Sequence, residues 1–229
     1  MAKTFVIGDI HGAHKALLQC LERSGFNKDE DNLICLGDVC DGWPETKESI
    51  NTLMSIRQLI YIMGNHDYWA LEWMRGEFPG EIWSVQGGDA TVRSYNGLPN
   101  DSHKAFLENS SLYHLIDNTL FVHAGVQPEI DLNDQSSNTF LWDRKLATSA
   151  LELRTAKAEK QLTSFDEIYL GHTPIHAYGY NHPIKACEIW FMDTGAGWNG
   201  CLSMMDINSK DFFTSDPVPS MYPEDKGRF

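Results

Sequence analysis

A short apolar run that ends abruptly in a polar cluster recurs along this chain, and no other feature restricts its fold as much. Continuous apolar runs of this kind are typical of strands buried on both faces of a sheet. The six runs are Thr4–Ile7, Leu33–Leu36, Leu59–Met63, Thr119–Val122, Ile168–Leu170 and Ile189–Met192. Ligands of α/β proteins gather at the carboxyl ends of such strands. The pattern therefore predicts an α/β fold with its functional site at these ends.

Segments with helical character separate several of the predicted strands. They are Ala13–Arg23, Glu45–Gln58, Ser102–Glu108 and Arg144–Leu162. Apolar residues recur at helical spacing in the first two, and the last is rich in Ala, Leu, Glu and Lys, which favour helix. A chain of 229 residues is long enough for one domain with a sizeable core. We therefore predict a single domain over residues 1–229.

Two segments stand outside this alternation of strands and helices. Residues 68–93 include Trp69, Trp73 and Trp83, and we expect a lid or insertion over the site. Residues 216–229 contain three prolines together with charged residues. Chain ends of this composition are often poorly ordered, so we expect an extended or loosely packed tail.

The charge of the chain narrows the classes of partner. It has 18 basic and 32 acidic residues, giving a formal net charge of −14. This charge argues against a broad nucleic-acid or anionic-membrane surface. The negative net charge does not exclude a small, locally positive site, because bound divalent cations can supply positive charge there. No apolar stretch is long enough for a signal peptide or a membrane span, and the five cysteines include no CxxC pair. We therefore expect a protein of the reducing cytoplasm.

Three dense polar clusters follow the first three apolar runs. Asp9 and His11 are two residues apart, so their side chains can reach one ion. Asp38 and Asp41 follow the second run, and a carboxylate has enough lone pairs to bridge two ions. Asn65 follows the third run and offers a neutral oxygen ligand. Each cluster taken alone is also compatible with a turn and a capping side chain.

Single histidines end two further strands, at His123 and His172. A lone histidine beside an apolar run is more often a core or surface residue than a ligand, and five others receive that interpretation: His14, His103, His114, His176 and His182. When the three clusters and these two histidines are taken together, a metal site explains them better than separate turns and core residues do. Asp, His and Asn ligands without Cys suit manganese, iron or zinc. Six ligands with one shared carboxylate suit two ions at a separation of ~3.5–4 Å.

The order of these motifs resembles the phosphoprotein phosphatase (PPP) family of calcineurin-like metallophosphoesterases. The matching strings are GDIHG at 8–12, GDVCD at 37–41, GNHD at 64–67, HAG at 123–125 and GHTP at 171–174. The chain is similar to the compact bacterial and lambda-type serine/threonine protein phosphatases. Diadenosine tetraphosphate hydrolases belong to the same superfamily. The resemblance implies a metallophosphoesterase-type β-sandwich of two mixed sheets flanked by helices.

The resemblance also implies a role for each motif residue. The implied metal ligands are Asp9, His11 and Asp38 for the first ion and Asn65, His123 and His172 for the second, with Asp38 bridging. His66 resembles the general acid of the family, and Asp41 resembles its orienting partner. Arg144, in the string LWDR, resembles an arginine that grips the phosphate.

One position departs from the family pattern. The family usually has an arginine directly after the second Asp of GDxxD, whereas this chain has Gly42 followed by Trp43. A planar, bidentate phosphate clamp is therefore missing from its usual place. Arg75, Arg93 or a lysine of segment 68–93 could replace it, or the pocket is wider.

These observations favour a two-metal phosphoesterase that hydrolyses phosphate monoesters, and within that class a serine/threonine phosphoprotein phosphatase. Its substrates would be phosphorylated proteins or small phosphoesters. The alternative is a diadenosine tetraphosphate (dinucleoside polyphosphate) hydrolase. Four aromatic residues near the motifs could stack on a base, although core or lid packing is their commoner use: Trp43, Tyr68, Trp69 and Trp73.

A non-catalytic, metal-stabilised scaffold is the third possibility. It would have no need of His66 and Asp41, which serve catalysis and not metal binding. Both residues are present, so the scaffold is the least favoured of the three functions. The two divalent ions are expected to be manganese, with iron or zinc as alternatives.

Overall fold

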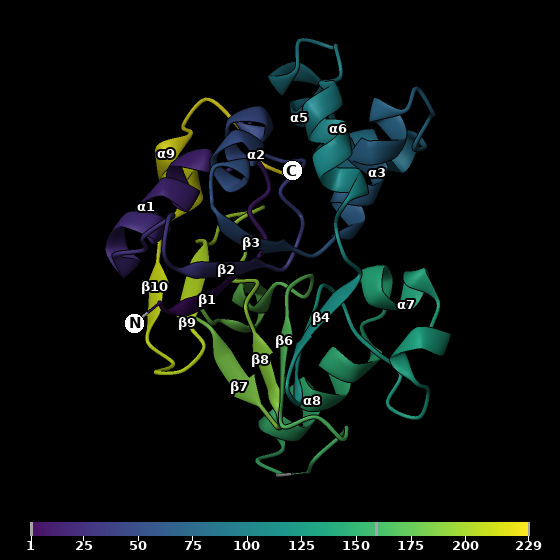
Figure 1. Ribbon diagram of the computed structural model, residues 1–229, viewed down its shortest axis with the longest axis vertical. Coiled ribbons are helices and arrows are strands. Elements are labelled where there is room, and N and C mark those ends of the chain that lie inside the picture. Colours follow the sequence, from purple (N-terminus) through teal and green to yellow (C-terminus); the bar gives the residue numbers. More distant parts are fainter. Residues whose placement is uncertain (1, 159, 229) are drawn as a thin grey trace.

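The computed structural model describes residues 2–158 and 160–228, and in it two mixed five-stranded sheets pack together with helices on their outer faces (Figure 1). The first sheet has the order β10-β9-β1-β2-β3 and the second has the order β4-β5-β6-β8-β7. Strands β1, β2 and β3 run parallel in the first sheet, as do β5, β6 and β8 in the second. The predicted fold class is confirmed.

The strands are short, with three or four residues each. Those of the first sheet are β1 (Thr4–Ile7), β2 (Asn32–Cys35), β3 (Gln58–Tyr61), β9 (Ser203–Asp206) and β10 (Phe212–Thr214). Those of the second are β4 (Tyr113–Ile116), β5 (Thr119–Val122), β6 (Glu167–Leu170), β7 (Ile184–Ala186) and β8 (Ile189–Phe191). Four of these strands were not predicted: β4, β7, β9 and β10.

Apolar side chains fill the space between the sheets and the space beneath the helices. Val6 and Ile34 of the first sheet share a buried cluster with Phe121 and Tyr169 of the second. The rings of Phe121 and Tyr169 stack with centroids 4.9 Å apart. Because these side chains are buried on the inner face, each sheet is held against the other and the strand ends keep fixed positions.

Helices cover the outer faces of both sheets. Helices α1 (His14–Ser24) and α2 (Thr46–Met54) pack on the first sheet, and α7 (Ser137–Trp142) and α8 (Lys145–Thr155) lie beside the second (Figure 1). A further group stands over the end of β3: α3 (Asn65–Met74), α4 (Glu81–Trp83), the π-helical turn η1 (Ser84–Gly88), α5 (Asp89–Ser94) and α6 (Asp101–Glu108). Short 3-10 turns occupy η2 (Leu132–Asp134) and η3 (Ile175–Tyr178). Within the described ranges, no helix combines the length and the apolar character needed to cross a membrane.

Two helices are shorter than the sequence predicted. The helix expected over Glu45–Gln58 ends at Met54, because Gln58 already pairs with β2 as the first residue of β3. The helix expected over Arg144–Leu162 ends at Thr155. There Lys157 adopts a left-handed backbone conformation with φ 54°, which stops the helix. Tertiary pairing and local backbone geometry thus override helix propensity in both places.

The predicted tail over 216–229 contains one short helix and two buried side chains in its described part. Helix α9 (Val218–Met221) is followed by Tyr222, whose side chain is buried and stacks on Trp43 with ring centroids 5.3 Å apart. The Tyr222 hydroxyl also accepts a hydrogen bond from the backbone N–H of Lys15 at 3.0 Å. Proline-rich composition limits regular structure, but it does not prevent aromatic side chains from packing.

Candidate metal centre

Six side chains meet at one edge of the sandwich. They follow the carboxyl ends of β1, β2, β3, β5 and β6, which run parallel to neighbouring strands in each sheet. None of the six exposes more than 6% of its surface. They are Asp9, His11, Asp38, Asn65, His123 and His172. The fold therefore brings the expected ligands together from both sheets.

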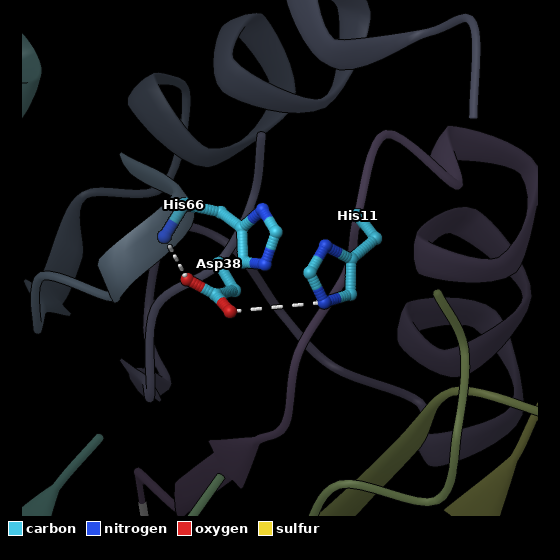
Figure 2. A group of neighbouring side chains, drawn as sticks. All are labelled: His11, Asp38 and His66. Carbon is cyan, nitrogen blue, oxygen red and sulfur yellow. Dashed lines mark hydrogen bonds and ion pairs between the residues drawn. The ribbon is translucent and has the colours of Figure 1, made fainter. Parts of the chain in front are cut away.

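The carboxylate of Asp38 lies at the centre of this group. Its Oδ2 is 3.7 Å from Nε2 of His11 and 3.4 Å from Nε2 of His123. Its Oδ1 accepts the backbone N–H of His66 at 2.9 Å (Figure 2). Potential ligand atoms lie within 4.8 Å of one another in two sets that share Asp38, namely His11–Asp38–His66 and Asp38–His123–His172. One carboxylate thus faces two adjacent donor groups.

The backbone fixes which nitrogen each histidine presents. His11 donates from Nδ1 to the carbonyl of Cys40 at 3.0 Å, and His123 donates from Nδ1 to the carbonyl of Leu36 at 2.8 Å. Nε2 is therefore the nitrogen that each of these two rings turns towards the centre of the site. Nε2 of His172 is buried and has no hydrogen-bond partner within residues 2–158 and 160–228. A buried nitrogen without a partner beside carboxylates fits a cation ligand.

Burial and charge act in opposite directions on the carboxylates. Burial raises the pKa of Asp9 well above its usual range, and the negative charge of Asp193 adds to the effect. Burial also disfavours the charged form of Asp38, but the positive charges of His123 and His66 outweigh it and hold its pKa well below its usual range. The same attraction outweighs burial at His123 and raises its pKa to about 9. Crowded buried carboxylates of this kind are stabilised by cations.

A second hydrogen-bonded group orients His66. Its Nδ1 donates to Oδ2 of Asp41 at 2.7 Å. Asp41 also accepts the indole N–H of Trp83 at 2.9 Å and the hydroxyl of Thr91 at 2.7 Å. Burial raises the pKa of Asp41, and these hydrogen bonds oppose the rise. Sequence reasoning identified Asp41 and His66 but missed Trp83 and Thr91, because both lie far along the chain in segment 68–93.

Asp67 caps the start of α3 and also has a wider part in the site. Its carboxylate accepts backbone N–H groups from Asp38 at 2.7 Å, Val39 at 2.9 Å and Gly64 at 2.9 Å. It also accepts the hydroxyl of Tyr61 at 2.8 Å. The loops after β2 and β3 are therefore tied together through one buried side chain. Its adjacency to Asn65-His66 was the available signal.

A cavity of about 280 Å³ opens over the centre. It is lined by Asn65, His66, Trp69, Ile82, Gln86, Trp142, Arg144, His172 and Arg228. Arg144 lies in it and donates from Nη2 to the carbonyl of His172 at 3.2 Å. No sequence pattern gave reason to expect Arg228 at the site.

Neither of the two arginines suggested as a replacement at Gly42 lines this cavity. Arg75 donates to Glu108 at 3.0 Å on the surface, and Arg93 lines a separate hollow. Of the four aromatic residues considered for stacking, Trp69 lines the cavity, whereas Trp43 is buried and donates its indole N–H to the carbonyl of Ala196 at 2.6 Å. Short distance along the sequence was a poor guide to which groups face the site.

Comparison with known proteins agrees with this geometry. The sequence profile of calcineurin-like phosphoesterases matches residues 2–198. Serine/threonine-protein phosphatase 1 of Salmonella typhimurium is 24% identical over 214 residues, which cover 89% of this chain and 91% of the relative. Bis(5'-nucleosyl)-tetraphosphatase PrpE [asymmetrical] of Bacillus thuringiensis is 27% identical in an alignment 248 positions long, gaps included, that covers 95% of this chain and 94% of the relative.

Solved structures share the fold at low sequence identity. A metallophosphoesterase from Sphaerobacter thermophilus superposes with a TM-score of 0.63 at 14% identity, covering 96% of this chain and 90% of that one. The cold-active protein-tyrosine phosphatase of a Shewanella species gives a TM-score of 0.62 at 14% identity, with coverage of 94% and 81%. With the profile match over most of its length, the chain belongs to the calcineurin-like phosphoesterase family and is a hydrolase of phosphoester bonds.

Proposed function

We propose that this protein is a two-metal phosphatase for phosphate monoesters, with phosphoserine and phosphothreonine proteins as its preferred substrates. The main support is the size of the cavity over the ligands, about 280 Å³. Sites for drug-sized ligands occupy about 300–1,000 Å³. A cavity of this size admits a phosphate group with a short leaving group. The similarity to the Salmonella phosphatase along nearly all of both chains is the second support.

The donor set fits two divalent ions, and we propose manganese, with iron or zinc as alternatives. The first ion would be held by Asp9, His11 and Asp38, and the second by Asp38, Asn65, His123 and His172. The unpartnered Nε2 of His172 and the two donor sets sharing Asp38 support this assignment. When bound, such ions supply Lewis acidity toward phosphate oxygens and lower the pKa of water.

His66 would protonate the leaving alkoxide, with Asp41 holding its ring in position. His66 also lies close enough to His11 and Asp38 to act as a metal donor, and carboxylate–histidine pairs do occur in metal sites. We assign it the acid role because Asp9, His11 and Asp38 already supply the first ion, whereas no other imidazole among the cavity-lining residues is bonded to a carboxylate. Arg144 would contact the non-bridging phosphate oxygens as a fixed cation.

A dinucleoside polyphosphate hydrolase is the second candidate. Trp69 and Trp142 both line the cavity, with ring centroids 4.8 Å apart and planes at 61°. Trp142 is 37% exposed, so a base could stack on it at the mouth. The similarity to the Bacillus tetraphosphatase PrpE also favours this candidate.

A non-catalytic scaffold would have no use for the hydrogen-bonded pair of His66 and Asp41. The family assignment points the same way, since it makes the chain a hydrolase. We propose that the protein acts on phosphorylated proteins or small phosphoesters, and its five free cysteines support the proposal that it does so in the cytoplasm.

Initial rates with matched substrates test the proposal. The metal-stripped protein would be reconstituted with manganese and given a phosphothreonine peptide, an aryl phosphate and diadenosine tetraphosphate. We expect manganese-dependent phosphate release from the peptide and the aryl phosphate at least about 10-fold faster than cleavage of the dinucleotide. Asp38→Asn serves as the matched inactive control, because it weakens both donor sets. Faster cleavage of the dinucleotide would support the second candidate, and activity on none of the three would refute both.

A further inference from the structure

The side chain of Arg228 reaches the cavity from the segment 222–228, far along the chain from the family motifs. Its backbone N–H donates to the carbonyl of Gly197 at 3.1 Å. Its Nη2 donates to Oε1 of Gln86 at 2.6 Å, and its Cζ lies 4.7 Å from the centre of the Trp198 ring. Contacts to two separate parts of the chain, Gln86 and residues 197–198, therefore hold Arg228 in one position.

Three glycines make room for the aliphatic part of Arg228. A Cβ atom at Gly42 would lie 3.1 Å from Cγ of Arg228, and one at Gly197 would lie 2.9 Å from Cδ. A Cβ at Gly87 would lie 3.4 Å from Cγ. Gly42 also has φ +95°, a conformation that residues with a side chain rarely adopt. Gly42 stands where the family usually has an arginine, and Arg228 occupies the space that a side chain at Gly42 would fill.

Two donors of Arg228 are available to an anion. Its Nε is buried and has no hydrogen-bond partner among the described residues. Its Nη1 is 3.2 Å from Nε2 of His11, the nitrogen that faces Asp38. A cation on His11 would take the lone pair that Nη1 now approaches, so this N–H would need another acceptor. An N–H of a charged guanidinium makes a short, strong hydrogen bond to a phosphate oxygen.

We propose that Arg228 binds the substrate phosphate in place of the arginine missing at Gly42, and so shares that task with Arg144. This inference rests on the proposed phosphatase function. Arg144 and Arg228 line the same cavity, and each comes from outside the metal-binding motifs. Segment 222–228 is anchored by Tyr222, which stacks on Trp43 directly after Gly42. Trp43, which follows the position of the missing arginine, therefore helps to hold the segment that contains Arg228.

Calorimetric titrations test this role apart from turnover. Manganese would be titrated into the metal-free protein, and inorganic phosphate into the manganese-loaded protein, for the wild type, Arg228→Ala and Arg228→Lys. Arg228→Ala should weaken phosphate binding about 10- to 100-fold, the usual loss for a hydrogen-bonded charged partner. Arg228→Lys should recover part of it, because lysine keeps the charge but not the planar guanidinium group. Manganese affinity should be unchanged or higher in Arg228→Ala, because a cation beside His11 has been removed.

Lys226→Ala is the matched control. Lys226 is an exposed cation in the same segment and does not line the cavity, so both affinities should stay at the wild-type level. Equal phosphate affinity in Arg228→Ala and the wild type would overturn the proposal and leave the phosphatase function standing. Loss of manganese binding in Arg228→Ala would also overturn it, since it would indicate a structural role. A wild type that binds phosphate with the expected dependence on Arg228, but hydrolyses no monoester, would refute the proposed function alone.

Discussion

Asp41 is a buried carboxylate that accepts side-chain hydrogen bonds from His66, Trp83 and Thr91. These donors favour its charged form against the effect of burial. The carboxylate in turn fixes the tautomer and the plane of the His66 ring. At the residue scale, the site therefore contains an imidazole held by a carboxylate that is itself held by two residues of segment 68–93.

Replacing His66 separates its two possible roles. His66→Asn should keep both metal ions but lower turnover of a phosphothreonine peptide about 100- to 10,000-fold, because the leaving alkoxide loses its proton donor. The loss should be much smaller with an aryl phosphate, whose leaving group needs less protonation. Metal analysis and initial rates with both substrates check this. A variant that loses one ion would identify His66 as a ligand instead.

At the scale of single elements, Glu167 at the start of β6 joins neighbouring strands at the end of the second sheet opposite the metal centre. Its Oε1 accepts Nζ of Lys185 in β7 at 3.0 Å and the indole N–H of Trp190 in β8 at 3.1 Å. Its Oε2 accepts Nζ of Lys210 and the hydroxyl of Tyr169. Although burial raises its pKa, the hydrogen bonds from Lys210, Lys185 and Trp190 outweigh burial and lower it to about 2.

This cluster predicts an acid-dependent part of the stability. Glu167 is more acidic in the folded protein than its ordinary value of 4.5, so its ionised form stabilises the fold above that pH. The stabilisation is lost as the pH falls from about 4.5 towards 2. Glu167→Gln should lower the free energy of unfolding by about 1–2 kcal/mol at pH 7, with a smaller difference at pH 3. Urea titrations at both pH values check this.

Glu129→Gln is a suitable control for that comparison, because Glu129 is exposed. It should leave stability unchanged at either pH. A destabilisation by Glu167→Gln that is equal at pH 7 and pH 3 would show that packing, and not ionisation, accounts for the effect.

The elements that could be predicted from sequence are those whose signal is local. Strands β1, β2, β3, β5, β6 and β8 are central or lead into the motifs, and their apolar runs end in Gly, Asp or His. Three of the four missed strands, β4, β7 and β10, lie at sheet edges, where one side lacks a pairing partner and the pattern is less apolar. No local sequence pattern indicates that Arg228 lies at the site, because its position depends on a late segment of the chain returning to the loop that contains Gly42.

At the scale of the whole molecule, the candidate metal centre spans the two sheets. Asp9, His11 and Asp38 follow strands of the first sheet, whereas His123 and His172 follow strands of the second. Ions held by both sets would link the sheets at the edge where Asp38 already faces His123 at 3.4 Å. Binding energy at this place therefore adds to the cohesion of the sandwich.

Removing the metal should lower the stability of the complete fold. For each ion, a free concentration 100 times its Kd stabilises the native state by about 2.7 kcal/mol. Differential scanning calorimetry with manganese and after chelation should show a higher Tm with the metal. Asp38→Asn should lose most of that shift, because it removes a charge shared by both donor sets. An equal shift in the variant would place the bound manganese elsewhere.

The position of Arg228 also has a consequence for biosynthesis. A ribosome releases residues in chain order, so all six candidate ligands, from Asp9 to His172, emerge before Arg228. Metal ligands can therefore gather in the nascent chain before the second arginine of the cavity has been made. If Arg228 binds phosphate as proposed, tight substrate binding requires that segment 222–228 is seated beside Trp43, and a chain interrupted shortly before Arg228 would hold metal yet bind its substrate poorly.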